Sequence, residues 1–124
     1  MTATATLQDL AERYIATWNE TDPTARRALV TDLWAEDGSY TDPLVAAEGL
    51  DAIDATLAAV QGQFAGLVFT LAGPVDAHHH IARFGWELGP AGGEALVVGF
   101  DVLVADAEGR IGQVHGFLDK VPSA

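Results

Sequence analysis

The chain has 124 residues, 49% of them hydrophobic, which is enough to bury one core but too short for two domains. Its 18 acidic residues outnumber six lysines and arginines, and the formal net charge of −12 disfavours contact with nucleic-acid phosphates or anionic lipids. We therefore expect a single globular domain over residues 1–124 that binds neither nucleic acid nor membranes.

The sequence shows no sign of a secretion signal or of a membrane-spanning helix. Residues 1–6 lack both a basic start and an apolar core, and no apolar stretch reaches the roughly 18 residues that a bilayer requires. The absence of cysteine excludes disulfides and thiolate metal sites. We expect a cytoplasmic protein.

Three helices are predicted in the first half of the chain. Apolar residues recur at helical spacing over residues 7–18. Asp22-Pro23 has the N-cap and first-turn pattern of a second helix, whose apolar face runs over residues 29–34. Gly49 precedes a third apolar face at residues 50–64.

Strands are predicted after the helices, because the hydrophobic period changes to two. The predicted strands lie at about residues 67–72, 76–88, 94–105 and 110–119, and a short extended piece lies earlier, at 38–43. The separating turns are Gly73-Pro74, residues 89–93 and residues 106–109. This order predicts an α+β fold with the helices packed on one face of an antiparallel sheet.

One acidic residue, Asp101, interrupts the apolar run from Ala95 to Val104. A carboxyl among strand residues must pair with a cation, take up a proton, or serve a site that uses its shifted pKa. Arg83 or Arg110 could neutralise it, or it could face water. A functional site is the other interpretation.

The turn at 106–109 predicts the register of the last hairpin. If Ala105 and Arg110 close the turn, Asp101 lies opposite Val114. The same face then carries Val97, Gly99, Leu103, Gly112, Gly116 and Leu118. Such a glycine-rich face around an acid favours a ligand cavity, although glycines can also mark bulges and tight curvature.

The opposite face of this hairpin is bulky. It carries Leu96, Val98, Phe100, Val102, Val104, Ile111, Gln113, His115 and Phe117. Because the helices can cover only one side of the sheet, this face would remain exposed on a monomer. We expect a homodimer formed through this outer face, with His115 in the interface rather than in a catalytic site.

Three consecutive histidines, residues 78–80, lie within a predicted strand. His78 and His80 would share a face while His79 points away, so only two imidazoles could act together. We predict no metal site, and we expect His80 to donate or accept a hydrogen bond in the pocket.

Several short segments, taken in order, are typical of one family. They are Arg13–Ala16, Trp34–Pro43, Gly49, Leu71–Val75, Asp101-Val102 and Glu108–Ile111. Over nearly its whole length the chain resembles the SnoaL-like and ketosteroid-isomerase-like branch of the nuclear transport factor 2 superfamily. The resemblance implies a cone-shaped, cystatin-like fold, in which a strongly curved antiparallel sheet wraps around N-terminal helices and a pocket. It also implies dimers formed through the outer face of the sheet.

The resemblance further implies an enzyme without a cofactor that performs acid–base chemistry on a small hydrophobic carbonyl compound, by isomerisation or by polyketide cyclisation. Asp42 matches the general base of the isomerases. Tyr14 and a protonated Asp101 match the donors to the enolate oxygen. The alternative is a non-catalytic domain of the same fold that holds an apolar ligand. In either case the expected substrate-binding residues are Trp18, Trp34, Leu57, Phe64, His80, Phe84, Trp86, Gly99, Val114 and Leu118.

Overall fold

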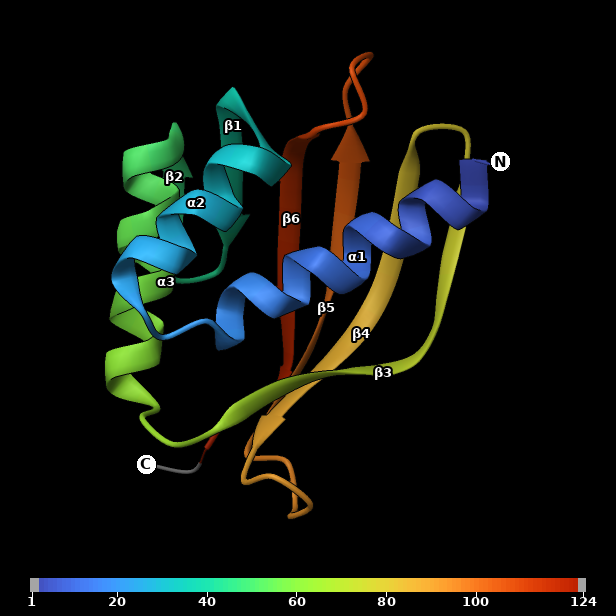
Figure 1. Cartoon of the computed structure of the whole chain (residues 1–124). Helices are drawn as coiled ribbons and strands as arrows, with labels where there is room; N and C mark the ends of the chain where they lie inside the picture. The colour runs from blue at the N-terminus through green and yellow to red at the C-terminus, as the bar shows by residue number, and fades with distance from the viewer. Residues whose placement is uncertain (1–2, 123–124) are drawn as a thin grey trace.

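The computed structural model describes residues 3–122, in which three helices accompany a six-stranded sheet (Figure 1). The helices are α1 (Ala3–Asn19), α2 (Pro23–Leu33) and α3 (Leu50–Gln63). The strands are β1 (Trp34–Asp42), β2 (Val45–Glu48), β3 (Val68–His78), β4 (Ile81–Gly89), β5 (Val97–Ala105) and β6 (Ile111–Lys120). Within this part of the chain, no helix is long and apolar enough to cross a membrane.

The strands form one curved, unclosed sheet in the order β2-β1-β6-β5-β4-β3. α1 lies across the sheet, while α2 and α3 pack together beside β1 and β2 (Figure 1). This is the α+β architecture that the order of elements predicts. The prediction of a fully antiparallel sheet is wrong for one pair, because β1 and β6 run parallel. The hairpin with β5 sets the direction of β6, and β1 joins the other edge of β6 from a distant part of the chain.

The predicted helices form where the apolar spacing places them. The apolar stripe of α1 is buried along its length: Leu7, Leu10, Ala11, Tyr14, Ile15 and Trp18. α2 begins as predicted, because the Asp22 side chain accepts a hydrogen bond from the Ala25 amide at 2.8 Å and Pro23 occupies the first turn. Trp34 does not extend α2 as predicted but begins β1 with extended backbone. The Arg110 guanidinium, distant in sequence, donates to the carbonyl oxygens at the end of the helix.

The predicted break at Gly73-Pro74 is an irregularity inside one strand, and the turn lies further on, at His79-His80. Gly73 has a φ of 81°, and the register with β4 shifts around it, so β3 bends here without ending. His79 adopts a φ of 52°, the left-handed conformation of tight turns. The prediction that His78 and His80 share a face of one strand is therefore wrong, since β3 ends at His78 and His80 lies in the turn, where both are exposed.

The register of the β5–β6 hairpin differs by two residues from the prediction. Asp101 pairs with Gly116 rather than with Val114. One residue of the shift arises because Ala105 pairs with Ile111 rather than with Arg110, and the second because Gly112 has no partner in the ladder. A shift of two residues keeps each side chain on its predicted face, so Asp101 still points to the inner side of the sheet. Ile111, beyond the irregularity, leaves the predicted outer face and is fully buried.

Candidate functional site

A cavity of about 600 Å³ lies between the helices and the inner face of the sheet. Most of its wall is apolar, from α1, α3 and strands β3 to β6: Ile15, Trp18, Val60, Phe64, Phe69, Trp86, Leu88, Val97 and Leu118. Leu44, Gln63, Val121 and Pro122 also border it. The remaining lining comes from Tyr40, Asp42, Asp101 and Gly116. An apolar cavity with a few convergent polar groups is typical of a small-molecule site.

Asp101 is buried, with 3% of its surface exposed, yet it borders this cavity. The Tyr14 hydroxyl donates to its Oδ2 at 2.7 Å, and the Trp86 indole Nε1 donates to its Oδ1 at 3.0 Å. Burial raises the pKa of Asp101 to about 6, although both hydrogen bonds favour the ionised form and so oppose that rise. The carboxyl therefore changes charge within one to two pH units of neutrality.

No arginine neutralises Asp101. Arg83 instead lies 3.3 Å from Asp76 in an exposed pair, and Arg110 donates to backbone carbonyl oxygens at the end of α2. Two of the interpretations of this acid, pairing with Arg83 or Arg110 and exposure to water, are therefore wrong. Hydrogen bonds from neutral groups hold the carboxyl beside the cavity.

Two glycines on the inner face make room for this arrangement. A Cβ atom at Gly99 would collide with the Phe117 carbonyl oxygen and lie 2.5 Å from Trp86 Cζ2, so only glycine lets the indole cross the sheet to Asp101. A Cβ atom at Gly116 would lie 2.9 Å from Asp101 Oδ1 and 3.5 Å from the Tyr40 hydroxyl oxygen. Gly116 thus keeps open the place where the polar groups of the cavity meet.

Asp42 accepts hydrogen bonds from a turn and from Tyr40, and it also borders the cavity. It is half-buried at the end of β1. Its Oδ1 accepts hydrogen bonds from the Leu44 and Val45 amides at 2.8 and 3.0 Å, which fastens the turn into β2. Its Oδ2 accepts the Tyr40 hydroxyl at 2.6 Å. The turn therefore holds one carboxylate oxygen, and the other lies with Tyr40 at the cavity.

Tyr40 is a site residue that the sequence analysis missed. It is 5% exposed, borders the cavity, and donates its hydroxyl to Asp42. Burial raises its pKa, and the nearby charge of Asp101 raises it further, so the phenol keeps its proton. The signal was available, because residues two apart on an extended piece share a face, and Tyr40 stands two before Asp42.

Six of the predicted site residues border the cavity: Trp18, Asp42, Phe64, Trp86, Asp101 and Leu118. Tyr14 lies deeper, with 1% of its surface exposed, and reaches Asp101 rather than the cavity lining. The structure places five others in the surrounding core: Trp34, Leu57, Phe84, Gly99 and Val114. His80 lies outside the cavity in the exposed β3–β4 turn, so the prediction of a pocket role for it is wrong. In residues 3–122, no three His, Asp or Glu side chains are arranged to hold a metal ion.

Comparison with known proteins identifies the family. The model of the SnoaL-like domain matches residues 11–114, which extend from α1 into β6 and include Tyr14, Asp42 and Asp101. The chain belongs to the SnoaL-like family. No protein of curated function matches it.

Solved structures agree with this membership. A protein from Agrobacterium tumefaciens, described as a "putative isomerase of the SnoaL-like family", is 42% identical, with 96% of this chain and 99% of that chain covered and a TM-score of 0.87. A "putative polyketide cyclase" from Sinorhizobium meliloti is 16% identical, with 94% and 99% covered and a TM-score of 0.70. An NTF2-like protein of unknown function from Exiguobacterium is 21% identical, with 89% and 98% covered and a TM-score of 0.71. The last two likenesses show the shared fold.

Proposed function

We propose that this protein is a cofactor-independent acid–base enzyme that moves a proton beside the carbonyl group of a small hydrophobic compound, in isomerisation or ring closure. The observation that carries the proposal is the convergence of Asp42, Tyr40 and Asp101 on one apolar cavity. The 42% identical protein described as a "putative isomerase of the SnoaL-like family" supports the same kind of reaction.

Asp42 is the general base in this proposal. Its Oδ1 is held by the turn, which directs Oδ2 toward the cavity. Oδ2 takes a proton from the carbon next to the substrate carbonyl, and the C–H electron pair moves into an enolate. In isomerisation, the Asp42 carboxyl returns the proton to a different carbon. In ring closure, the enolate carbon attacks a second carbonyl of the same molecule, and the new alkoxide takes the proton.

Asp101 stabilises the enolate oxygen. An apolar ligand displaces water from the cavity and so favours the protonated form of Asp101, whose pKa burial already raises to about 6. The protonated carboxyl then donates a hydrogen bond to the oxygen, while the Tyr40 hydroxyl, whose one proton is donated to Asp42 Oδ2, positions the base. One such donor typically lowers the barrier by about 3 kcal/mol. Tyr14 acts through Asp101, because its hydroxyl is bonded to Asp101 Oδ2.

Hydrogen–deuterium exchange tests this proposal without knowledge of the natural substrate. The probe is acetonaphthone in deuterium oxide, and proton NMR follows loss of the methyl signal next to its carbonyl. We expect the protein to accelerate the exchange and Asp42→Asn to slow it by about 100-fold or more. Asp37→Asn, which changes an exposed acid of the same strand, should have no effect. Equal exchange rates for Asp42→Asn and the unaltered protein would falsify the role of Asp42 as base.

A non-catalytic ligand-binding domain is the second candidate. The observation that favours it is the complete hydrogen bonding of Asp42, whose two oxygens accept two amides and one hydroxyl as a turn cap would. In that case acetonaphthone binds, which calorimetry detects, but the protein does not accelerate exchange. Asp42→Asn then lowers thermal stability and changes nothing else.

A further inference from the structure

Among residues 3–122, the cavity is bordered by the carboxyl groups of Asp42 and Asp101 but by no positive side chain. All six lysine and arginine side chains of the chain form ion pairs or hydrogen bonds outside the cavity. Five form ion pairs with acids outside the cavity lining: Arg13–Asp32, Arg26–Asp54, Arg27–Asp51, Arg83–Asp76 and Lys120–Glu94. The sixth, Arg110, donates to backbone carbonyl oxygens at the end of α2.

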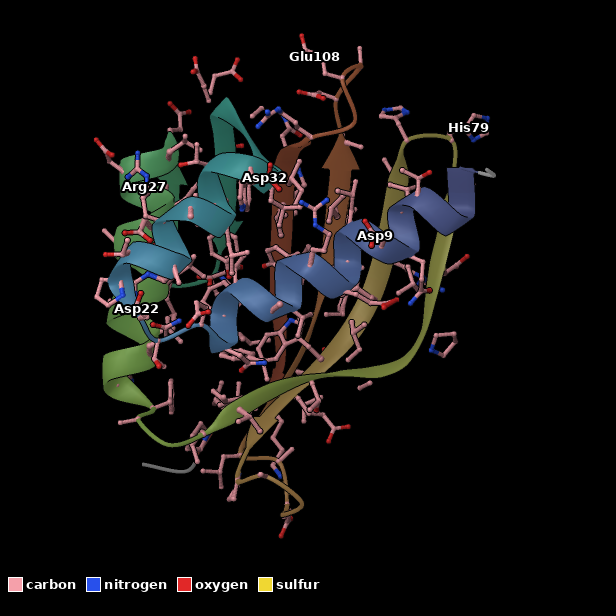
Figure 2. All side chains as sticks on the ribbon, viewed as in Figure 1. Asp9, Asp22, Arg27, Asp32, His79 and Glu108 are labelled. Carbon is pink, nitrogen blue, oxygen red and sulfur yellow. The ribbon has the colours of Figure 1, made fainter. Side chains whose placement is uncertain are left out.

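The histidines do not supply a positive charge to the cavity either. His78, His79 and His80 lie at the exposed β3–β4 end of the sheet, and Figure 2 shows His79 at the tip of that turn. His115 is exposed, and its ring lies 3.2 Å from Gln113 on the outer face. Among the described residues, none of the histidines borders the cavity.

The carboxyl groups have hydrogen-bond partners but no counter-charge. Asp101 accepts from the neutral Tyr14 and Trp86 side chains, and Asp42 accepts from Tyr40 and from two amides. Neutral donors stabilise a carboxylate but leave its net charge uncancelled. The potential in the cavity is therefore negative, and the wall of low polarity screens it weakly. A carboxylate or phosphate ligand is repelled.

The wall adds a second feature that suits a positive ligand. Five aromatic side chains border the cavity: Trp18, Tyr40, Phe64, Phe69 and Trp86. Their faces attract cations through the ring quadrupole, most strongly for tryptophan. Asp101 Oδ1, Asp42 Cβ and the Tyr40 hydroxyl oxygen lie within 3.5 Å of the position that a Cβ atom at Gly116 would take, and all four residues border the cavity. A charged nitrogen in the cavity at this part of the wall is attracted by both acids.

We propose that the cavity binds hydrophobic amines in their protonated form, with the ammonium group at the part of the wall that Asp42 and Asp101 form and the apolar part against the aromatic side chains. This inference uses the same cavity as the proposed function but not its chemistry.

The test uses isothermal titration calorimetry at a slightly alkaline pH to compare three ligands that share one shape but differ in charge. They are naphthylmethylamine, which is cationic, naphthylmethanol, which is neutral, and naphthoate, which is anionic. We expect the amine to bind about tenfold or more tightly than the alcohol, which corresponds to about 1.4 kcal/mol, and naphthoate to bind most weakly. Asp101→Asn and Asp42→Asn should each reduce the preference for the amine, and Asp37→Asn should keep it.

The inference is overturned if the amine binds no tighter than the alcohol, including the case in which neither binds. It is also overturned if the preference persists in both cavity variants, since the charge would then act from elsewhere. Failure here leaves the proposed function standing when acetonaphthone exchange still depends on Asp42. Conversely, a preference for the amine without any exchange supports the inference and ends the proposed function.

Discussion

At the scale of single residues, burial and hydrogen bonding have opposite effects on the pKa of Asp101. Burial disfavours its charge, whereas Tyr14 and Trp86 favour it, and burial prevails by raising the pKa from 3.8 to about 6. The folded state therefore binds a proton here more readily than the unfolded chain. Protonation of Asp101 therefore contributes to the free energy of unfolding. This contribution is fully present below about pH 4 and is lost as the pH rises to about 6.

This linkage predicts the pH dependence of Asp101→Asn, which cannot titrate. The free energy of unfolding of the unaltered protein, minus that of the variant, should fall by about 3 kcal/mol between about pH 4 and pH 7. Urea denaturation at several pH values measures both. The other acids titrate in both proteins, so their contributions cancel in this difference. A difference that stays constant with pH would show that the pKa of Asp101 is ordinary.

Gly116 offers a second test at this scale. A methyl group there fills the space between Asp101 and Tyr40, so Gly116→Ala should reduce exchange of acetonaphthone by about tenfold or more. The control is Gly62→Ala, because no atom lies within 4 Å of a Cβ atom at this position in α3. That change should keep the exchange rate and raise stability by about 0.5–1 kcal/mol, as alanine favours helix. Equal exchange in both variants would show that the space over Gly116 is not used.

At the scale of elements, a buried polar network holds the helices that form part of the cavity. Arg26 of α2, 6% exposed, donates to Asp54 at 2.8 Å and to Gln61 at 2.9 Å, both on α3. The Gln61 amide donates in turn to the Trp18 and Glu20 carbonyl oxygens at 3.1 and 2.8 Å, at the end of α1. The network thus sets the positions of Trp18 and of α3 beside the cavity.

Breaking the buried pair should therefore cost more than breaking an exposed one. Asp54→Asn leaves the Arg26 guanidinium buried without a counter-charge, and we expect it to lower the free energy of unfolding by about 3 kcal/mol. Asp51, whose side chain is 94% exposed, is the partner of Arg27, and Asp51→Asn should cost less than about 1 kcal/mol. Urea denaturation of the two variants measures both values. Equal losses of unfolding free energy in the two variants would mean that burial does not strengthen the Arg26–Asp54 pair.

At the scale of the whole molecule, none of the helices in the described part of the chain covers the outer face of the sheet. Phe100 and Phe117 stack there with ring centroids 4.9 Å apart, and Phe117 is 48% exposed. Val98, Val102 and Val104 are half-buried beside them. We propose that a second copy of the chain covers this face, as expected from the sequence, because an apolar stripe of this kind seldom faces water.

Light scattering tests the dimer. Phe117→Glu places a charge in the centre of the proposed interface, so the molar mass in solution should fall from that of a dimer to that of a monomer. Leu44→Glu is the matched control, since Leu44 is 84% exposed and borders the cavity rather than the outer face. A monomeric mass for the unaltered protein, or a dimeric mass for Phe117→Glu, would contradict the proposed interface.

Much of this protein could be predicted from local patterns. The helical spacing of α1 is confirmed residue by residue, and the Asp22-Pro23 start of α2 is confirmed by its cap. The inner position of Asp101 was predicted correctly even from a register that was wrong by two residues, because the alternation of a strand survives such a shift. The turn at His79 could not be predicted, because Gly73-Pro74 looks like a turn and only the ladder with β4 shows that the strand continues.

The sequence by itself determined the family, the positions of the three helices and the face on which Asp101 lies, since spacing along a chain is enough to decide these. Only the tertiary structure decided which polar side chains contact one another at the cavity. It placed Tyr14 behind Asp101, across 87 positions in sequence, and brought Tyr40 to the cavity beside Asp42. The physical reason is that such meetings depend on the curvature of the sheet, on irregularities in β3 and β6, and on the parallel pairing of β1 with β6. Each of these arises from contacts between distant segments.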